Sequence, residues 1–404
     1  MSAADHSPVH RSANASRAWR GAPLLSRGFR PFFLGAGVWA LVGIALWPAV
    51  FSGAITIPTA FSTVDWHAHE MIFGYGGAVV AGFLLTAIPN WTGRLPVAGM
   101  LLAALAALWV AGRIAVFASA PIGRAGAAVV DVGFLVVFAA LVAREVVAGK
   151  NWRNLKVALV VLALALANVA FHVEDAREGM AEFSIRAALG IIVMLILLIG
   201  GRVIPSFTGN WMARMGAGAR PLPFGRPDSA ALALSGIALL AWVIEPQGVV
   251  VGVLAFAAGA ANLWRLSRWR GFAARRDALV LVLHAGFLLA SLGFFAAGAS
   301  ALAPARVPYA VGVHTWAIGA IGIMTLAMMT RATLGHTGRA LLASRATIFA
   351  YLCVGLAFVG RLAMAFFPDQ ALPLMHLAAC AWGIGFAAFL FAYGPMLTRR
   401  SGPG

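Results

Sequence analysis

The most restrictive feature of this sequence is a series of long apolar runs that continues along almost the whole chain. Each run holds about 20 residues, enough to cross ~30 Å of hydrocarbon as an α-helix that rises 1.5 Å per residue. Because a helix satisfies its own backbone hydrogen bonds in lipid, such runs predict transmembrane helices. Twelve are expected, at 29–51, 67–90, 97–119, 126–148, 155–173, 184–207, 228–246, 248–265, 277–298, 308–331, 345–367 and 370–397.

The composition excludes a soluble globular domain. Hydrophobic residues make up 62% of the 404 positions and charged residues 11%, with a mean hydropathy of +0.89. These values are typical of an all-α integral membrane protein. We predict a basic tail at 1–28, a twelve-span domain at 29–398 and a short C-terminal segment at 399–404.

A formal charge of +17 by itself would suggest a protein that binds nucleic acid, but the positions of the charged residues indicate otherwise. The basic residues alternate by loop, and 24 of the 30 Lys and Arg residues fall on the side of the N-terminal tail. The positive-inside rule therefore predicts that both termini are cytoplasmic and that the partner of the basic residues is membrane lipid. The predicted tail lacks the apolar core of a secretory leader. Cys353 and Cys380 stand alone, so any haem is expected to be non-covalently bound.

Three stretches resemble one another and suggest an internal repeat. They are "IPNWTGR" (88–94), "IPSFTGNW" (204–211) and "TLGHTGR" (333–339), each with a Thr-Gly pair expected just past the inner end of spans two, six and ten. This spacing predicts three four-helix units. The alternative is that Thr-Gly is simply a good helix stop, because glycine relieves strain at a C-terminal cap.

Histidines gather at the end of the bundle that the charge pattern predicts to be outer, here called the outer end. An imidazole inside a membrane is costly unless it is paired or ligated, so such residues indicate function. Neutral imidazole is a common ligand of haem iron and of copper. The histidines expected at the outer end are His67, His69, His172, His314 and His376, whereas His284 is expected in the inner half of span nine.

Two of these histidines occupy equivalent positions of the repeat and are the predicted haem ligands. His67 precedes Thr92 by almost the same stretch of chain as His314 precedes Thr337. On an ideal helix His67 shares one face with Glu70, Met71 and Gly74, whereas His69 points about 160° away. The two neighbouring histidines are therefore expected to have different partners, and the glycines of this helix suit a flat macrocycle.

Four stretches closely resemble the NnrS family of bacterial membrane proteins. They are "GFRPFFLGA" (28–36), "WHAHEMIFGY" with "GFLLTAIPNWTGR" (66–94), "GGRVIPSFTGNW" (200–211) and "GVHTWAIGAIGIMTLAMMTRATLGHTGR" (312–339). The resemblance implies a haem- and copper-containing protein of the bacterial inner membrane that helps cells tolerate nitric oxide.

A weaker resemblance is to the catalytic subunit of haem-copper oxidases and nitric oxide reductases, which implies twelve helices in three four-helix arcs. His67, Met71 and Phe73 match the haem-ligand pattern HGxxMxF of its second helix, with Ala68 in place of glycine. Its tenth helix carries an HxH pair, of which this chain has only His314. Its copper histidines lie in helices six and seven, where this chain has none. One six-coordinate haem b between His67 and His314 is the expectation that remains.

Copper must then bind elsewhere. The candidate ligands are His69, Glu70 and His172 near the outer surface, with Glu174 or Asp175 nearby, and His284 if spans two and nine are close. Arg331 and His336 lie about 30 Å from the outer histidines in a straight helix, too far to share their metal. A helix-end cap and contact with lipid headgroups are expected for them.

Two functions follow from these patterns. The first is a haem and copper protein of the nitric oxide response that binds nitric oxide or converts it with electrons from an unidentified donor. The second is a proton- or metal-coupled transporter that uses the outer histidines. The near absence of buried acids, with Asp131 and Glu145 expected toward the ends of span four, and the parallel repeat disfavour transport.

Overall fold

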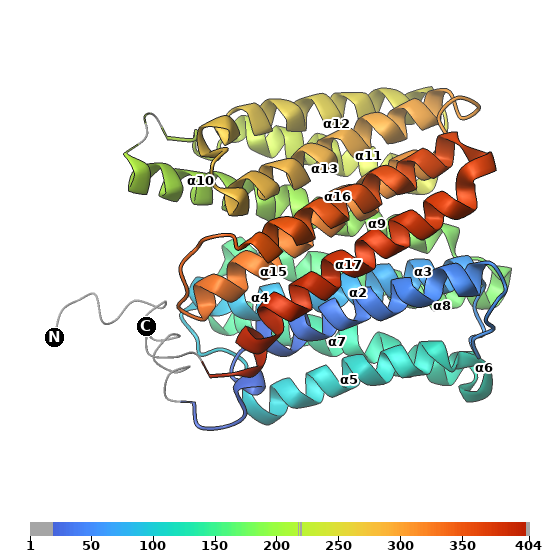
Figure 1. The fold of residues 1–404 in the computed structure, drawn as a ribbon, viewed down its shortest axis with the longest axis horizontal. Helices are drawn as coiled ribbons and strands as arrows, with labels where there is room; N and C mark the ends of the chain where they lie inside the picture. The colour runs from blue at the N-terminus through green and yellow to red at the C-terminus, as the bar shows by residue number, and fades with distance from the viewer. Residues whose placement is uncertain (1–18, 217, 219, 401–404) are drawn as a thin grey trace. The chain divides into compact units, whose positions relative to one another are not determined.

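The structure of the chain is a computed structural model that describes residues 19–216, 218 and 220–400. The described residues form helices and no strand, and twelve of these helices are long and apolar enough to cross a membrane (Figure 1). All twelve predicted spans are confirmed, within a few residues at most ends. Residues 1–18 of the predicted tail and 401–404 of the predicted C-terminal segment lie outside the described residues.

The first six spans are built from ten helical elements. They are α2 (Phe29–Phe51); α3 (Thr63–His69), η3 (Glu70–Gly76) and α4 (Gly77–Thr92); α5 (Gly99–Phe117); α7 (Arg124–Ala148); α8 (Leu155–Glu178); and α9 (Glu182–Leu195), η5 (Ile196–Gly200) and α10 (Gly201–Met215).

The other six spans follow in chain order. They are α11 (Arg226–Ile244); α12 (Val249–Ser267); α13 (Ala278–Leu302); α14 (Tyr309–His314), η7 (Thr315–Gly322) and α15 (Ile323–His336); α16 (Arg345–Phe366); and α17 (Ala371–Thr398). A short helical turn, η2 (Pro23–Leu25), precedes the first span. Others lie between spans, at α6 (Ser119–Ile122), η4 (Trp152–Asn154), η6 (Gly271–Ala274) and η8 (Pro368–Gln370).

The three Thr-Gly pairs do not all end a helix. Gly93 caps α4 in the left-handed conformation with φ +72°, and Gly338 follows α15 with φ +73°. Thr208 and Gly209, however, lie inside α10, which continues to Met215, so the prediction of a helix end at this pair is wrong. All three threonines nevertheless donate their hydroxyl to the carbonyl four residues earlier.

The same three spans each contain a π-helical segment, namely η3, η5 and η7. A π turn inserts an extra residue into a helix and is frequent at functional sites. The start of η3 precedes Thr92 by the same stretch of chain as the start of η7 precedes Thr337, whereas η5 begins much closer to Thr208. The match of spans two and ten favours the repeat, which stays a prediction.

Contacts divide the chain into two units. Unit 1 comprises Met1–Ala188, Met329–Ala340 and Phe389–Gly404, and unit 2 comprises Leu189–Met328 and Leu341–Ala388. In unit 1, α2 packs against α4, α5 against α7, and α7 against α8. At the inner end of this unit, Arg30 links α2 to the end of α17. Its Nη1 donates to the carbonyls of Met396, Leu397 and Arg399.

Unit 2 packs α12 against both α11 and α13, and α13 against α14 and η7. Its interior contains a fully buried arginine, Arg265, which donates to Asp228 Oδ1 (3.3 Å), Asn262 Oδ1 (2.9 Å) and the Leu197 carbonyl (3.3 Å). The last bond is made to a carbonyl of η5. Arg265 therefore holds the irregular segment of span six to α11 and α12.

Candidate metal centre

Span two begins with a capped α-helical turn and then changes to a π-helix. Ser62 Oγ accepts from the backbone N–H of Asp65 (3.1 Å) and donates to Asp65 Oδ2 (2.9 Å), which is the arrangement of a stable helix N-terminus. Helix α3 runs only from Thr63 to His69, where η3 begins. His69 is thus the last residue before the π-helical segment.

His67 and Glu70, which were predicted to share one helical face, contact different residues in the structure. His69 Nδ1 lies 3.0 Å from Glu70 Oε1, and both side chains are fully buried. The His67 ring instead stacks on Trp47, with centroids 4.1 Å apart. The separate prediction that His67 and His69 have different partners is confirmed.

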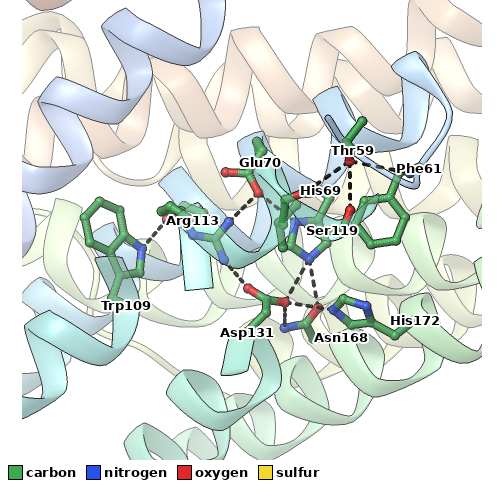
Figure 2. A network of polar contacts seen from close by, with 12 residues as sticks. Thr59, Phe61, His69, Glu70, Trp109, Arg113, Ser119, Asp131, Asn168 and His172 are labelled. Atoms are coloured by element: carbon green, nitrogen blue, oxygen red, sulfur yellow. Dashed lines mark hydrogen bonds and ion pairs between the residues drawn. The ribbon is translucent and has the colours of Figure 1, made fainter. Parts of the chain in front are cut away.

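Four side chains from three helices converge around one carboxylate oxygen (Figure 2). Asp131 Oδ2, from α7, lies 3.0 Å from His69 Nε2 and 3.0 Å from His172 Nε2, and Asn168 Nδ2 of α8 donates to it at 2.9 Å. Asn168 Oδ1 is also 3.1 Å from His69 Nε2. The accessible fractions are 0% for His69, 1% for Asp131 and 7% for His172, so the cluster is closed to solvent.

Arg113 of α5 balances the charge of this cluster only in part. Its Nη1 donates to Glu70 Oε1 (2.6 Å), and its Nη2 pairs with Asp131 Oδ1. One guanidinium thus faces two carboxylates, and both ring nitrogens of His69 face carboxylate oxygens. With His69 doubly protonated the charges balance; with His69 neutral the site carries one surplus negative charge, and a cation bound at Nε2 would take the place of the lost proton.

Aromatic rings enclose the cluster. The Phe171 ring centroid is 4.7 Å and the Phe61 centroid 6.1 Å from that of His69, and Phe61 is also 5.6 Å from His172. Outside Phe61, Arg124 donates to the Ala60 carbonyl (2.7 Å) and pairs with Asp175. The loop that carries Phe61 therefore forms the cover of the site at the outer end.

The ligand atoms of His69, Asp131 and His172 all lie within 4.8 Å of one another, which makes them the one group of this kind among the described residues. Two imidazole nitrogens and one carboxylate oxygen are a donor set that suits first-row transition metals. Glu70, beside His69 Nδ1, is placed to accept the proton of that nitrogen, as carboxylates commonly do for metal-bound histidine. The predicted ligands His69 and His172 are brought together, whereas Glu70 supports His69 rather than joining the group.

Two of the remaining predicted ligands, His284 and His314, lie in unit 2. His284 Nε2 is 2.9 Å from Thr208 Oγ1, whose own proton is donated to the Ile204 carbonyl, so this nitrogen must be the donor. His314 Nδ1 donates to the Ala310 carbonyl at 2.8 Å. His67 belongs to unit 1 and His314 to unit 2, and their pairing around one haem stays a prediction.

The glycines of span two do not form an open face. A Cβ at Gly74 would lie 2.7 Å from Arg113 Nη1 and 2.9 Å from Trp39 Nε1, and one at Gly82 would lie 2.7 Å from the Phe33 ring. The expectation of a macrocycle flat against these two glycines is therefore wrong, because side chains of the protein cover them. The methyl group of Met71 lies against Gly43 of α2.

The inner residues Arg331 and His336 are part of the interior packing of unit 1. Arg331 is buried within α15, and Arg27 Nη1 donates to His336 Nδ1 at 3.1 Å. Phe29 also packs on the His336 ring, with centroids 5.7 Å apart. Arg27 itself lies before the first span, and burial beside Arg30 lowers its pKa to about 10.

Sequence reasoning missed three members of the cluster: Arg113, Asp131 and Asn168. Two signals were present. Asn168 and His172 are four residues apart and share one face of a helix, and Asp131 is an acid inside an apolar run, which marks function in a membrane. The sequence did not show that these residues, which come from separate spans, meet at His69.

The chain matches the family described as NnrS protein over residues 23–401, nearly its whole length. It belongs to the NnrS family. No curated protein matches it. NnrS membership together with the twelve apolar helices makes this a multi-pass membrane protein of the nitric oxide response. The matched residues include every member of the buried cluster.

Proposed function

We propose that this NnrS protein binds copper through His69, Asp131 and His172 in the bacterial inner membrane and protects the cell against nitrosative stress by binding or redox conversion of nitric oxide. The observation that carries the proposal is the convergence of three metal-ligating side chains in a site closed to solvent. Copper accepts imidazole and carboxylate ligands, and a cation at His69 Nε2 would replace the proton that otherwise balances the two carboxylates.

Each neighbour of the ligands has a separate task in this proposal. Glu70 holds the Nδ1 proton of His69 and so orients Nε2 toward the metal. Arg113 fixes both carboxylates, and Asn168 fixes Asp131. A copper ion held there supplies a redox-active Lewis acid. Phe61 and Phe171 exclude water and ions but suit a small uncharged ligand such as nitric oxide.

The proposal includes haem b with His314 as an axial ligand. Because His314 Nδ1 donates to a carbonyl, the lone pair of the neutral ring is on Nε2, which is the tautomer that iron requires. This tautomer of His314 is the observation that supports the proposed axial ligand. A bound haem supplies an iron centre that transfers electrons or binds a diatomic gas.

The test is metal and haem analysis of the chain purified in detergent, with His69→Gln, Asp131→Asn and His172→Gln as site variants. We expect about one copper per wild-type chain and less than roughly a tenth of that in each variant, because each loses one of three ligands. His376→Gln, an exposed histidine, is the control. Full copper in the three variants would remove this site from the proposal, and full copper in His284→Gln would exclude His284.

Transport of a proton or metal ion is the second candidate, and one observation favours it. The buried acids Glu70 and Asp131, together with the π-helical segments of three spans, correct the expectation that buried acids are nearly absent. Both acids are paired with Arg113, however, and aromatic rings close the outer end. Copper uptake into proteoliposomes that exceeds the uptake into protein-free vesicles would support transport over a resident metal.

A further inference from the structure

The side-chain amide of Asn168 lies beside the three proposed copper ligands and is itself fully buried. Asn168 belongs to α8, where it precedes His172 by one helical turn and therefore shares its face of the helix. Figure 2 shows Asn168 next to His69, Asp131 and His172. A polar side chain in the interior of a membrane-spanning helix is costly and indicates a role.

The contacts of this amide determine which of its two ends faces His69. Its Nδ2 donates to Asp131 Oδ2 at 2.9 Å, and its Oδ1 lies 3.1 Å from His69 Nε2. The reverse orientation would place Oδ1 against the Asp131 carboxylate, which would bring two acceptors into contact. Asn168 therefore presents an oxygen, the end of an amide that binds metal ions, to a proposed ligand nitrogen.

The distances around His69 Nε2 suit a shared ion. Asp131 Oδ2 lies 3.0 Å and Asn168 Oδ1 3.1 Å from this nitrogen, and His172 Nε2 lies 3.0 Å from Asp131 Oδ2. Nitrogen and oxygen ligands bind first-row divalent ions at about 2.0–2.2 Å, so adjacent ligands at angles of about 90–109° are about 2.8–3.6 Å apart. The measured contacts lie within this range, and Asn168 Oδ1 fits as well as the carboxylate does.

A metal ion at His69 Nε2 would take away the hydrogen-bond donor of Asn168 Oδ1. A ring nitrogen that binds a metal carries no proton, and Oδ1 contacts no other donor among the described residues. A buried carbonyl oxygen without a partner is costly. An amide oxygen that joins the coordination of the ion avoids this cost.

The buried Asn262 of α12 shows how a structural amide differs. Its Oδ1 accepts from Arg265 Nη1 at 2.9 Å, and its Nδ2 donates to Ser235 Oγ (2.8 Å) and to the Ala258 carbonyl (2.9 Å). Both ends of this amide are bonded to groups that do not bind metal ions. Asn262 is therefore the matched control for Asn168.

The donor atoms of the cluster also favour one oxidation state of copper. Both cysteines, Cys353 and Cys380, lie in unit 2, and the methyl group of Met71 lies against Gly43. Cu(I) prefers thiolate and thioether sulfur, whereas imidazole nitrogen together with oxygen ligands suits Cu(II). A fourth ligand that is an oxygen strengthens the preference for Cu(II).

We propose that Asn168 Oδ1 is the fourth ligand of the copper centre and makes the site selective for Cu(II) over Cu(I). The inference rests on the proposed function, because it requires copper at His69, Asp131 and His172. The competing role for Asn168 is to position Asp131 through Nδ2 alone, and the experiment distinguishes the two.

The experiment measures Cu(II) and Cu(I) affinity, the electron paramagnetic resonance spectrum and the midpoint potential of the full chain in detergent. We expect Asn168→Leu to bind Cu(II) about tenfold or more weakly and Cu(I) as wild type does. Its potential should rise by about 59 mV for each tenfold loss of Cu(II) affinity. Asn168→Asp keeps an oxygen ligand but loses the amide donor, and it should restore Cu(II) binding. Folded Asn262→Leu should match wild type in all four measurements.

Each outcome separates ligation from positioning. A wild-type spectrum, Cu(II) affinity and potential in Asn168→Leu would overturn the inference and leave the copper centre intact. Weak Cu(II) binding in both Asn168→Leu and Asn168→Asp would show that Asn168 only positions Asp131, and would also overturn it. Absence of copper from the wild type would overturn the proposed function and this inference together.

A measurement on the wild type alone covers the case in which Asn168→Leu fails to fold. The Cu(II) spectrum is recorded in ordinary water and in water enriched in the magnetic isotope of oxygen. Broadening of the lines by the isotope would show that a water molecule is the fourth ligand and would overturn the inference. Identical line widths support a ligand oxygen that comes from the protein.

Discussion

Each unit contains a buried arginine at the centre of a polar cluster, and the two clusters differ in how their charges are balanced. Arg113 in unit 1 faces two carboxylates, Glu70 and Asp131, and two imidazoles stand beside them. In unit 2, Arg265 and Arg268 share the single carboxylate of Asp228. The first site can exchange a proton of His69 for a metal cation, whereas the second already has two cations for one carboxylate.

The comparison shows that a buried arginine does not by itself mark a functional site. Arg265 donates to a carboxylate, an amide oxygen and a backbone carbonyl, and its guanidinium lies over the rings of Trp269 and Phe287. No histidine or second acid joins it among the described residues. We infer that the unit 2 site stabilises the fold and that the unit 1 site binds a ligand.

The largest expected effect comes from removing the acid of each site. Asp131→Asn and Asp228→Asn should each lower the free energy of unfolding by about 3–5 kcal/mol, the cost of breaking a buried ion pair. Only Asp131→Asn should also lose copper. Thermal unfolding in detergent with copper analysis of the same samples checks this, and equal copper loss in both variants would contradict the comparison.

Copper itself should stabilise one site and not the other. At a free concentration one hundred times the dissociation constant, copper should raise the unfolding free energy of the wild type by about 2.7 kcal/mol. His172→Gln should remove most of this increment, and the exposed His376→Gln should keep it. The measurement is unfolding with and without added copper. An unchanged increment in His172→Gln would exclude this histidine as a ligand.

A glycine lies against each arginine and gives a matched pair of smaller changes. A Cβ at Gly74 would press on Arg113, and a Cβ at Gly201 would press on Arg265. Alanine at either position should cost about 1–3 kcal/mol through overpacking. Gly74→Ala should also reduce copper content, whereas Gly201→Ala should leave it at the wild-type level. Loss of copper in both variants would mean that general instability, not the site, is being measured.

The smallest expected effect concerns the cover of the metal centre. Phe61→Leu keeps an apolar side chain and should cost less than about 1.5 kcal/mol. It should nevertheless speed the release of copper to a chelator, because the ring lies beside both His69 and His172. Phe256→Leu, at an aromatic pair in unit 2, is the control and should leave the release rate unchanged. Equal rates in all three proteins would show that copper leaves by another route.

The spans were predictable because crossing a membrane depends on local hydropathy, which a sequence states directly. The span at 29–51 coincides with α2, and most other predicted limits differ from the helices by a few residues. The exceptions lie where a helix continues beyond its apolar stretch. Helix α10 continues through Thr208 to Met215, and α8 continues to Glu178, because polar residues outside the hydrocarbon region still form helix.

The candidate site was predictable only in part. His69 and His172 were expected near one another because both border the outer end of a span, and the structure brings them to the same carboxylate oxygen. Glu70 was placed on the face of His67, and the structure shows that its carboxylate contacts His69 Nδ1 and Arg113. A helical wheel places Cα positions, whereas the direction of a long side chain depends on the partners that neighbouring helices bring to it.

The amino-acid sequence by itself determined the twelve membrane-spanning helices and the concentration of histidines toward one end, because both depend on residue type and on spacing along the chain. Only the tertiary structure decided which of these histidines meet an acid. Asp131 lies far from His69 in the chain, yet their side-chain atoms are 3.0 Å apart. That contact exists because α7 packs beside span two and α8, and side-by-side packing of helices is a long-range property that no local pattern specifies.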